Sequence, residues 1–317
     1  MNLETPKKFQ GLVNQAHQVA ENYFRPISRK YDKAEHAYPK ELDLLAALLD
    51  GMNAGSPDAI GATSASKRGA AREQQEGIKN GGNISALLGV MELCWGDVGL
   101  LLAMPRQGLG NAAIAAVAND EQLARFSGTW AAMAITEPGC GSDSAAIRTT
   151  AIKDGDHYVL NGEKIYVTSG QRADAVVVWA TLDKSLGRAA IKSFVVEHGT
   201  PGMTVTRLEK KLGIKASDTA AISFSDCRVP AANLLGNPEI DVQKGFAGVM
   251  ETFDNTRPLV AGMAVGVAKA SLDRTRELLK KVMSETVVPK WADRSSADTV
   301  AAFNASLSPI LGFEAKK

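Results

Sequence analysis

The sequence has little of what would build a disulfide framework, a metal centre or a membrane anchor. Its 317 residues include three cysteines and four histidines, all far apart. Scattered cysteines in an odd number argue against disulfides and favour a reducing, cytoplasmic compartment. No histidine lies at metal-ligand spacing from another histidine or a cysteine, so no metal site is expected. No apolar run approaches ~20 residues, and the N-terminus lacks the apolar core of a signal peptide, so no membrane span is expected.

The chain also lacks an excess of charge of either sign. Lysine and arginine number 36 against 35 aspartate and glutamate residues, which gives a formal net charge of +1. Without a global field, nothing in the composition indicates nucleic acid or an anionic membrane as a partner. Hydrophobic residues make up 45% and charged residues 22% of the chain. These fractions are typical of a globular protein, and a chain of this length can bury a sizeable core.

The residue pattern changes twice along the chain. Helical periodicity dominates up to about residue 126, apart from a Gly-, Ser- and Ala-rich stretch at 51–82 that is predicted to be a flexible loop. Short Val-, Ile- and Thr-rich runs with turn pairs then indicate antiparallel strands. Helical periodicity returns at 242–283, where Pro258 should kink the helix, and a weak helix is expected at 297–307.

The predicted fold class is therefore α+β, with three domains. They are an N-terminal helical domain over residues 1–129, a central antiparallel β domain over 130–236, and a shortened C-terminal helical domain over 237–317. Two local predictions accompany this division. Asp120 should cap the short helix at 120–126, and Asn161-Gly162 should form a hairpin turn because both residues tolerate positive φ.

Four segments stand out for their chemistry: TEPGCGSD at 136–143, NGEKIYVTSG at 161–170, KLGIKASDT with DCRVP at 211–230, and FDNTRP at 253–258. The first offers hydroxyl groups and backbone amides that glycine leaves accessible in a tight loop, which suits an anion or a polar ring edge. An ordinary Pro-Gly turn would have the same sequence. The second places Tyr166 and Thr168 on one strand face, where a flat cofactor could lie, although half-buried strands are common. Asp254 and Arg257, at i and i+3 on a helix, could be a mere surface ion pair worth ~0–1 kcal/mol. A fifth segment, GLGNAA at 108–113, mimics a dinucleotide fingerprint but follows a helix instead of a strand, so it is set aside.

Taken together and in this order, the four segments resemble the acyl-CoA dehydrogenase family, most closely its medium-chain members, from about Leu109 to Arg276. The resemblance implies FAD as the cofactor, acyl-CoA as the substrate and electron-transfer flavoprotein as the electron acceptor. It also implies a homo- or hetero-oligomer and a role in fatty acid metabolism.

The resemblance assigns roles to individual residues by matching position. Ile135 and Thr136 should meet the flavin ring, Ser142 should lie near both the diphosphate and the substrate, and Thr168 should bond near N5. Tyr166 stands where the family usually has tryptophan and should pack on the flavin. The substrate-binding residues should be Ser142, Asp254 and Arg257, with the last two lining the coenzyme A channel. We expect Thr136, Ser142, Tyr166 and Thr168 to share one concave surface.

The catalytic base is not identified in this sequence. The family's reaction needs a carboxylate to remove the α proton while the flavin accepts the β hydride. Some members carry that glutamate on the helix of the DNTR segment, but Thr256 occupies the position here. Glu314 lies in a C-terminal segment that faintly resembles the family's usual catalytic segment, and Glu251 lies on the helix. Neither glutamate is adopted as the base. The leading hypothesis is thus an acyl-CoA dehydrogenase, and the alternatives are a non-catalytic or partner-completed subunit and an acyl-CoA oxidase.

Overall fold

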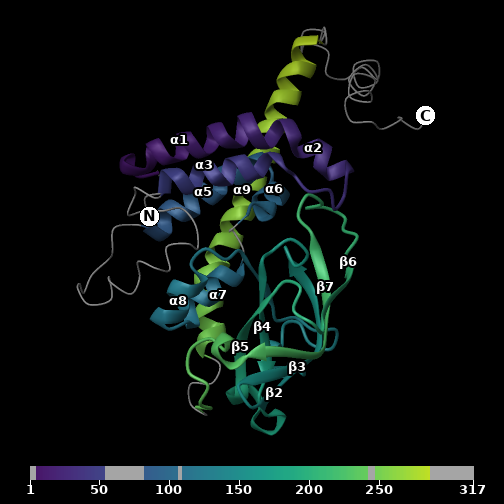
Figure 1. The fold of residues 1–317 in the computed structure, drawn as a ribbon. Coiled ribbons are helices and arrows are strands. Elements are labelled where there is room, and N and C mark those ends of the chain that lie inside the picture. Colours follow the sequence, from purple (N-terminus) through teal and green to yellow (C-terminus); the bar gives the residue numbers. More distant parts are fainter. Residues whose placement is uncertain (1–4, 54–81, 106–108, 242–246, 286–317) are drawn as a thin grey trace. The chain divides into compact units, whose positions relative to one another are not determined.

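The structure is a computed structural model that describes residues 5–53, 82–105, 109–241 and 247–285. The chain forms two compact units, residues 1–266 and 267–317. The described part of the second unit is the end of one long helix, α9 (Ala247–Glu285). The first unit holds the other helices and the sheet (Figure 1). The predicted loop at 51–82 lies almost wholly, and the predicted helix at 297–307 wholly, outside the described residues.

The N-terminal helices pack around a cluster of apolar side chains. They are α1 (Gln10–Val19), α2 (Arg25–Lys33), α3 (Glu41–Asn53), α5 (Gly82–Gly96) and α6 (Val98–Ala103). Phe24, Leu42 and Leu100 lie at the centre of this cluster and are almost fully buried. Asp97 separates α5 from α6, since its carboxylate accepts the Leu100 N–H at 2.9 Å as an N-cap.

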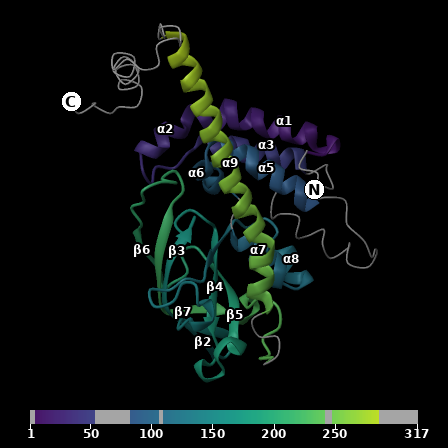
Figure 2. The same cartoon turned by 180° about the vertical axis from the view of Figure 1, so that it is seen from behind.

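A seven-stranded sheet follows two further short helices, α7 (Leu109–Val117) and α8 (Asp120–Phe126). The strands are β1 (Ala131–Ala134), β2 (Thr150–Asp154), β3 (His157–Thr168), β4 (Ala175–Thr181), β5 (Ile191–Glu197), β6 (Met203–Leu208) and β7 (Thr219–Pro230). Their order is β1-β4-β2-β3-β7-β6, with β5 also paired to β4. Helices before, a sheet between and a helix after confirm the predicted fold class (Figure 2). Two pairings are parallel, β1 with β4 and β2 with β4, and the turn pattern gave no sign of these crossovers.

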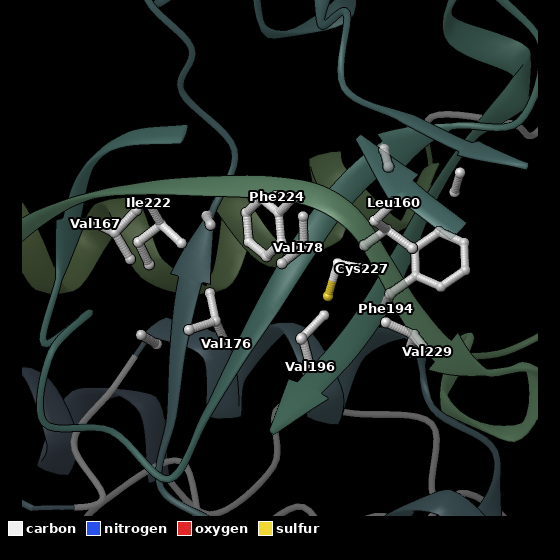
Figure 3. Packing of buried hydrophobic residues seen from close by; sticks show 14 of the residues in the cluster. Leu160, Val167, Val176, Val178, Phe194, Val196, Ile222, Phe224, Cys227 and Val229 are labelled. Atoms are coloured by element: carbon white, nitrogen blue, oxygen red, sulfur yellow. The ribbon is translucent and has the colours of Figure 1, made fainter. Parts of the chain in front are cut away.

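Strand β4 is buried along its whole length because both of its faces carry a hydrophobic core. Val176 and Val178 point into the cluster inside the curled sheet, together with Phe194, Ile222 and Phe224 (Figure 3). The alternate residues Val177 and Trp179 face α7, α8 and the start of α9. A strand covered on both faces needs a continuous apolar run, which explains the sequence AVVVWA.

The predicted hairpin at Asn161-Gly162 is wrong. Strand β3 continues through both residues, and the register against β7 shifts there, as at a β-bulge. Gly162 has φ +152°, and a Cβ on it would lie 2.4 Å from Thr149 Oγ1. The glycine is therefore explained by close packing and not by a turn. The β2–β3 hairpin turns instead at Gly155, whose φ is +63°.

The predicted cap of α8 is displaced by one residue. Asn119, not Asp120, is the N-cap, and its side chain and that of Gln122 form a reciprocal capping box. Helix α9 runs as one element through Pro258. The three-domain boundaries at 129/130 and 236/237 stay a prediction.

Candidate functional site

The TEPGCGSD segment forms a closed turn directly after β1. Glu137 N donates to Cys140 O at 3.0 Å, and Cys140 N donates back to Glu137 O at 3.1 Å. Pro138 and Gly139 occupy the two positions between them. Thr136 precedes the turn, and Gly141 and Ser142 follow it. Because the turn is closed, the two ends of the motif lie close together.

Strand β3 runs beside this turn and departs from regular alternation. Ile165 N donates to Thr136 O at 2.9 Å, which ties the strand to the turn. Tyr166 has φ +58°, and the register against β7 shifts between Lys164 and Val167. This bulge places two consecutive residues, Ile165 and Tyr166, on the side that also carries Thr168, while Val167 is buried. The two-residue period therefore gives the right face for Tyr166 and Thr168 but does not anticipate Ile165.

A pocket of about 280 Å³ lies where the turn, β3 and α9 meet. Its wall combines hydroxyl, apolar and aromatic side chains with one guanidinium. The lining residues are Leu109, Met133, Ile135, Thr136, Gly141, Ser142, Ser144, Ile165, Tyr166, Thr168, Phe253 and Arg257. None of these twelve described residues is an aspartate or a glutamate.

Comparison with known proteins gives the same picture. The model of the acyl-CoA dehydrogenase middle domain matches residues 132–227. The butyryl-CoA dehydrogenase of Megasphaera elsdenii superimposes with a TM-score of 0.71 at 27% identity, over 99% of this chain and 82% of its own. The chain belongs to the acyl-CoA dehydrogenase family.

Two further proteins that are similar to this chain carry names other than acyl-CoA dehydrogenase. The acryloyl-CoA reductase (NADH) of Anaerotignum propionicum is 33% identical over 287 residues, which are 86% of this chain. This chain spans only 66% of that reductase's length. A solved structure described as the electron transferring flavoprotein of Acidaminococcus fermentans has a TM-score of 0.67 at 28% identity, over 99% of this chain and 82% of its own.

Six of the seven binding residues predicted from the acyl-CoA dehydrogenase resemblance line the one pocket. They are Ile135, Thr136, Ser142, Tyr166, Thr168 and Arg257. The seventh, Asp254, is exposed on α9 and does not line it. Arg257 stacks its guanidinium over the Phe253 ring, 4.8 Å from the centroid. What these residues bind stays a prediction.

Sequence reasoning missed a buried ion pair behind the pocket wall. Lys164 Nζ donates to Glu137 Oε1 at 2.8 Å and to Ile135 O at 3.1 Å, and the lysine is fully buried. Burial raises the pKa of Glu137, but the charge of Lys164 and several donated hydrogen bonds outweigh it, so this pKa lies below its ordinary value. Burial lowers the pKa of Lys164. One signal was available: both residues sit inside the motifs, beside lining residues.

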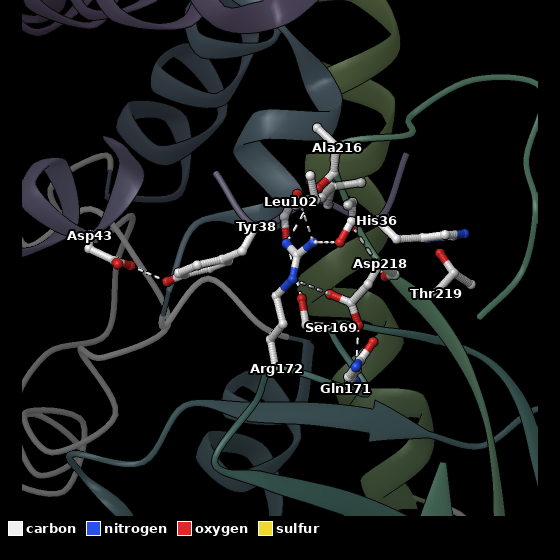
Figure 4. Close-up of polar contacts among 12 residues, drawn as sticks. His36, Tyr38, Asp43, Leu102, Ser169, Gln171, Arg172, Ala216, Asp218 and Thr219 are labelled. Carbon is white, nitrogen blue, oxygen red and sulfur yellow. Dashed lines mark hydrogen bonds and ion pairs between the residues drawn. The ribbon is translucent and has the colours of Figure 1, made fainter. Parts of the chain in front are cut away.

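A second polar network explains the KLGIKASDT segment (Figure 4). Arg172 lies 3.4 Å from Asp218 Oδ1, bonds the Ala216 carbonyl at 3.4 Å, and bonds the carbonyls of His36 and Ala37. Asp218 in turn accepts the Gln171 N–H at 2.9 Å. The segment therefore joins the chain that follows Thr168 to the turn between α2 and α3, which contains His36. Within the segment, the Lys211 ammonium donates to the Ser217 carbonyl and to the Thr219 hydroxyl.

Among the residues that the structure describes, no group of three or more metal-ligating side chains comes together. Helices long and apolar enough to cross a membrane are likewise missing from this part of the chain.

Proposed function

We propose that this chain is an FAD-dependent acyl-CoA dehydrogenase. The reaction would remove the α proton and the β hydride of an acyl-CoA thioester. The observation that carries the proposal is the meeting of six motif residues, from three separate stretches of sequence, around one pocket. Random surface turns and strands would not gather the very residues that the family resemblance selects.

The pocket suits one end of a flat, partly polar ring system. Ile135, Met133 and Leu109 supply apolar surface, and the hydroxyl residues Thr136, Ser142 and Thr168 supply hydrogen-bonding groups. Tyr166 keeps 62% of its surface exposed although it is a large ring, which leaves it open to contact by a ligand. Ligand sites combine apolar walls with a few placed polar groups in this way. When bound, FAD would supply the hydride acceptor.

The substrate would approach from the α9 side of the pocket. Arg257 brings a positive charge to a wall that has no carboxylate among its lining residues. Such a group suits the phosphates and carbonyls of a coenzyme A thioester. Asp254, one residue beyond Phe253, is exposed and would meet only the outer part of the bound coenzyme A.

A non-catalytic flavin- or acyl-CoA-binding subunit is the second candidate, because none of the pocket-lining residues is a carboxylate. Thr256 does not supply the missing base, since its hydroxyl donates to Thr252 O at 3.0 Å inside α9. Glu314 lies outside the described residues, as does the side chain of Glu251.

The test begins with the absorption spectrum of the purified chain mixed with FAD. Bound oxidised flavin that is bleached anaerobically by acyl-CoA supports the dehydrogenase. Flavin that binds but is not bleached supports the non-catalytic subunit. Peroxide formed with acyl-CoA in air would point to an oxidase, and failure to bind flavin at all would overturn the whole proposal.

The partners and compartment follow as part of the same proposal. Electron-transfer flavoprotein is proposed as the electron acceptor, supported by the likeness to the Acidaminococcus fermentans structure. An oligomer and a cytoplasmic location in fatty acid metabolism complete it. All three cysteines are free thiols, which supports a reducing compartment.

A further inference from the structure

The buried pair of Glu137 and Lys164 lies directly behind the pocket, and neither residue lines it. Their chain neighbours do. Ile135 and Thr136 precede Glu137, while Ile165 and Tyr166 follow Lys164. The pair is thus a link between the two stretches of chain that form most of the wall.

Each member of the pair holds several parts of the chain at once. Glu137 accepts the Arg148 N–H at 2.7 Å, the Thr149 N–H at 2.9 Å and the Thr149 hydroxyl at 2.6 Å, besides the Lys164 ammonium. Lys164 also donates to the carbonyl of Ile135 at 3.1 Å. The contacts therefore fix the turn, the segment that enters β2, and strand β3 relative to one another.

Stability alone is a poor explanation for such a pair. Desolvation of two buried charges offsets much of their attraction, so a buried ion pair often contributes little compared with apolar residues of similar size. Its hydrogen bonds, however, have defined directions and lengths. What the pair supplies is the position of the backbone at Ile135 and Thr136.

We propose that Lys164 and Glu137 are positioning residues of the flavin site: they hold the 135–142 turn against β3 and so set the geometry of the pocket. The inference rests on the proposed function, because the ligand it concerns is FAD. The ammonium of Lys164 reaches the Ile135 carbonyl from behind, which leaves the pocket side of that peptide free for the ligand.

The first experiment measures FAD affinity by fluorescence titration for the wild type, Lys164→Met and the double variant Lys164→Met/Glu137→Gln. Lys164→Met should raise the Kd by at least about tenfold, since it removes two charge-assisted hydrogen bonds. The exposed lysine on β2 provides the matched control, Lys153→Met, which should bind like the wild type.

The double variant separates positioning from stability. Lys164→Met leaves a buried carboxylate without its cation, and Glu137→Gln removes that charge, so thermal stability should recover in part. FAD affinity should stay low, because the Ile135 carbonyl still lacks its lysine donor. Affinity that recovers together with stability would reduce the pair to a structural role and overturn the proposal.

Hydrogen–deuterium exchange on the cofactor-free chain gives a readout that needs no flavin. Peptides covering 136–149 should exchange faster in Lys164→Met, while those covering β5 should not change. If the wild type fails to bind FAD, the proposed function is wrong. The exchange data alone then decide whether the pair holds the 135–142 turn against β3. A wild type that binds FAD, beside a Lys164→Met variant of equal affinity and equal exchange, sinks only the inference.

Discussion

At the residue scale, the proposed flavin site depends on hydroxyl groups held on a rigid strand and turn. Thr168 is the last residue of β3, where its backbone pairs with Thr219 of β7. We expect Thr168→Val to weaken FAD binding by about tenfold, the loss of one well-placed hydrogen bond in a partly buried site. Fluorescence titration measures this. Thr204→Val, at an exposed strand position on β6, is the control and should leave the Kd unchanged. Equal affinity in both variants would remove Thr168 from the site.

The lowered pKa of Glu137 predicts how the stability of the fold changes with pH. Its pKa is lowered from an ordinary value of 4.5, because Lys164 and its hydrogen-bond donors outweigh burial. A carboxylate with a depressed folded pKa stabilises the fold above its unfolded pKa and loses that contribution as the pH falls through the folded value. The wild type should therefore lose stability below about pH 4.5 more steeply than Glu137→Gln. Urea unfolding between pH 3 and 7 gives the comparison, and parallel curves would contradict the prediction.

At the scale of elements, helix α7 rests so closely on β1 that only glycine fits at the contact. A Cβ on Gly110 would lie 2.2 Å from the Ala132 carbonyl oxygen. Gly11 in α1 is also helical but has nothing within 4 Å of such a Cβ. Gly110→Ala should destabilise the fold by about 2 kcal/mol or more, through overpacking. Gly11→Ala should stabilise it by about 0.5–1 kcal/mol, through helix propensity. Thermal or urea unfolding of both variants checks the contrast, which equal effects would disprove.

The same contact explains why GLGNAA resembles a dinucleotide fingerprint. Gly110 serves helix–strand packing, and the segment opens a helix that lies against β1, without a preceding strand. Sequence reasoning was right to set the motif aside, on the ground that a helix precedes it. It could not supply the packing reason, since the Ala132 carbonyl comes close only after the chain has folded.

Elements were predictable from the sequence where one local pattern decides them. The buried run of β4 and the turn residues between strands are such cases, and the fold class followed from them. Asn161-Gly162 was not, because a glycine needed for a turn and one needed for close packing against Thr149 look alike. The face that Tyr166 shares with Thr168 was predictable from strand period. The bulge that adds Ile165, and the Glu137–Lys164 contact across 27 residues, depend on pairing between distant segments.

At the scale of the whole molecule, the pocket needs three parts of the chain that no local pattern brings together. The turn after β1 and strand β3 come from the sheet, while Phe253 and Arg257 come from α9. Charge is unevenly shared among them. The lining residues include one arginine and, within the described chain, no carboxylate. Under the proposed function, this wall would meet an electron-accepting ring and an anionic thioester, and none of its described lining residues is a carboxylate that could remove a proton.

Catalysis by this chain should accordingly be slow, and it should respond to a single carboxylate placed on α9. Absence of a positioned general base typically costs about 10²–10⁴ in rate. Thr256 lies three residues after Phe253 and one before Arg257, next to the two α9 residues that line the pocket. Family members that carry their base on this helix have glutamate at this position. We expect Thr256→Glu to accelerate anaerobic flavin bleaching by acyl-CoA at least about tenfold over the wild type. Thr256→Gln has the same size without the ionisable group and should stay as slow as the wild type.

Rapid bleaching by the wild type would show that a base is already present, and Glu314→Gln and Glu251→Gln would then locate it. A Thr256→Glu variant that binds FAD normally but bleaches no faster than Thr256→Gln would show that α9 does not present residue 256 to the substrate.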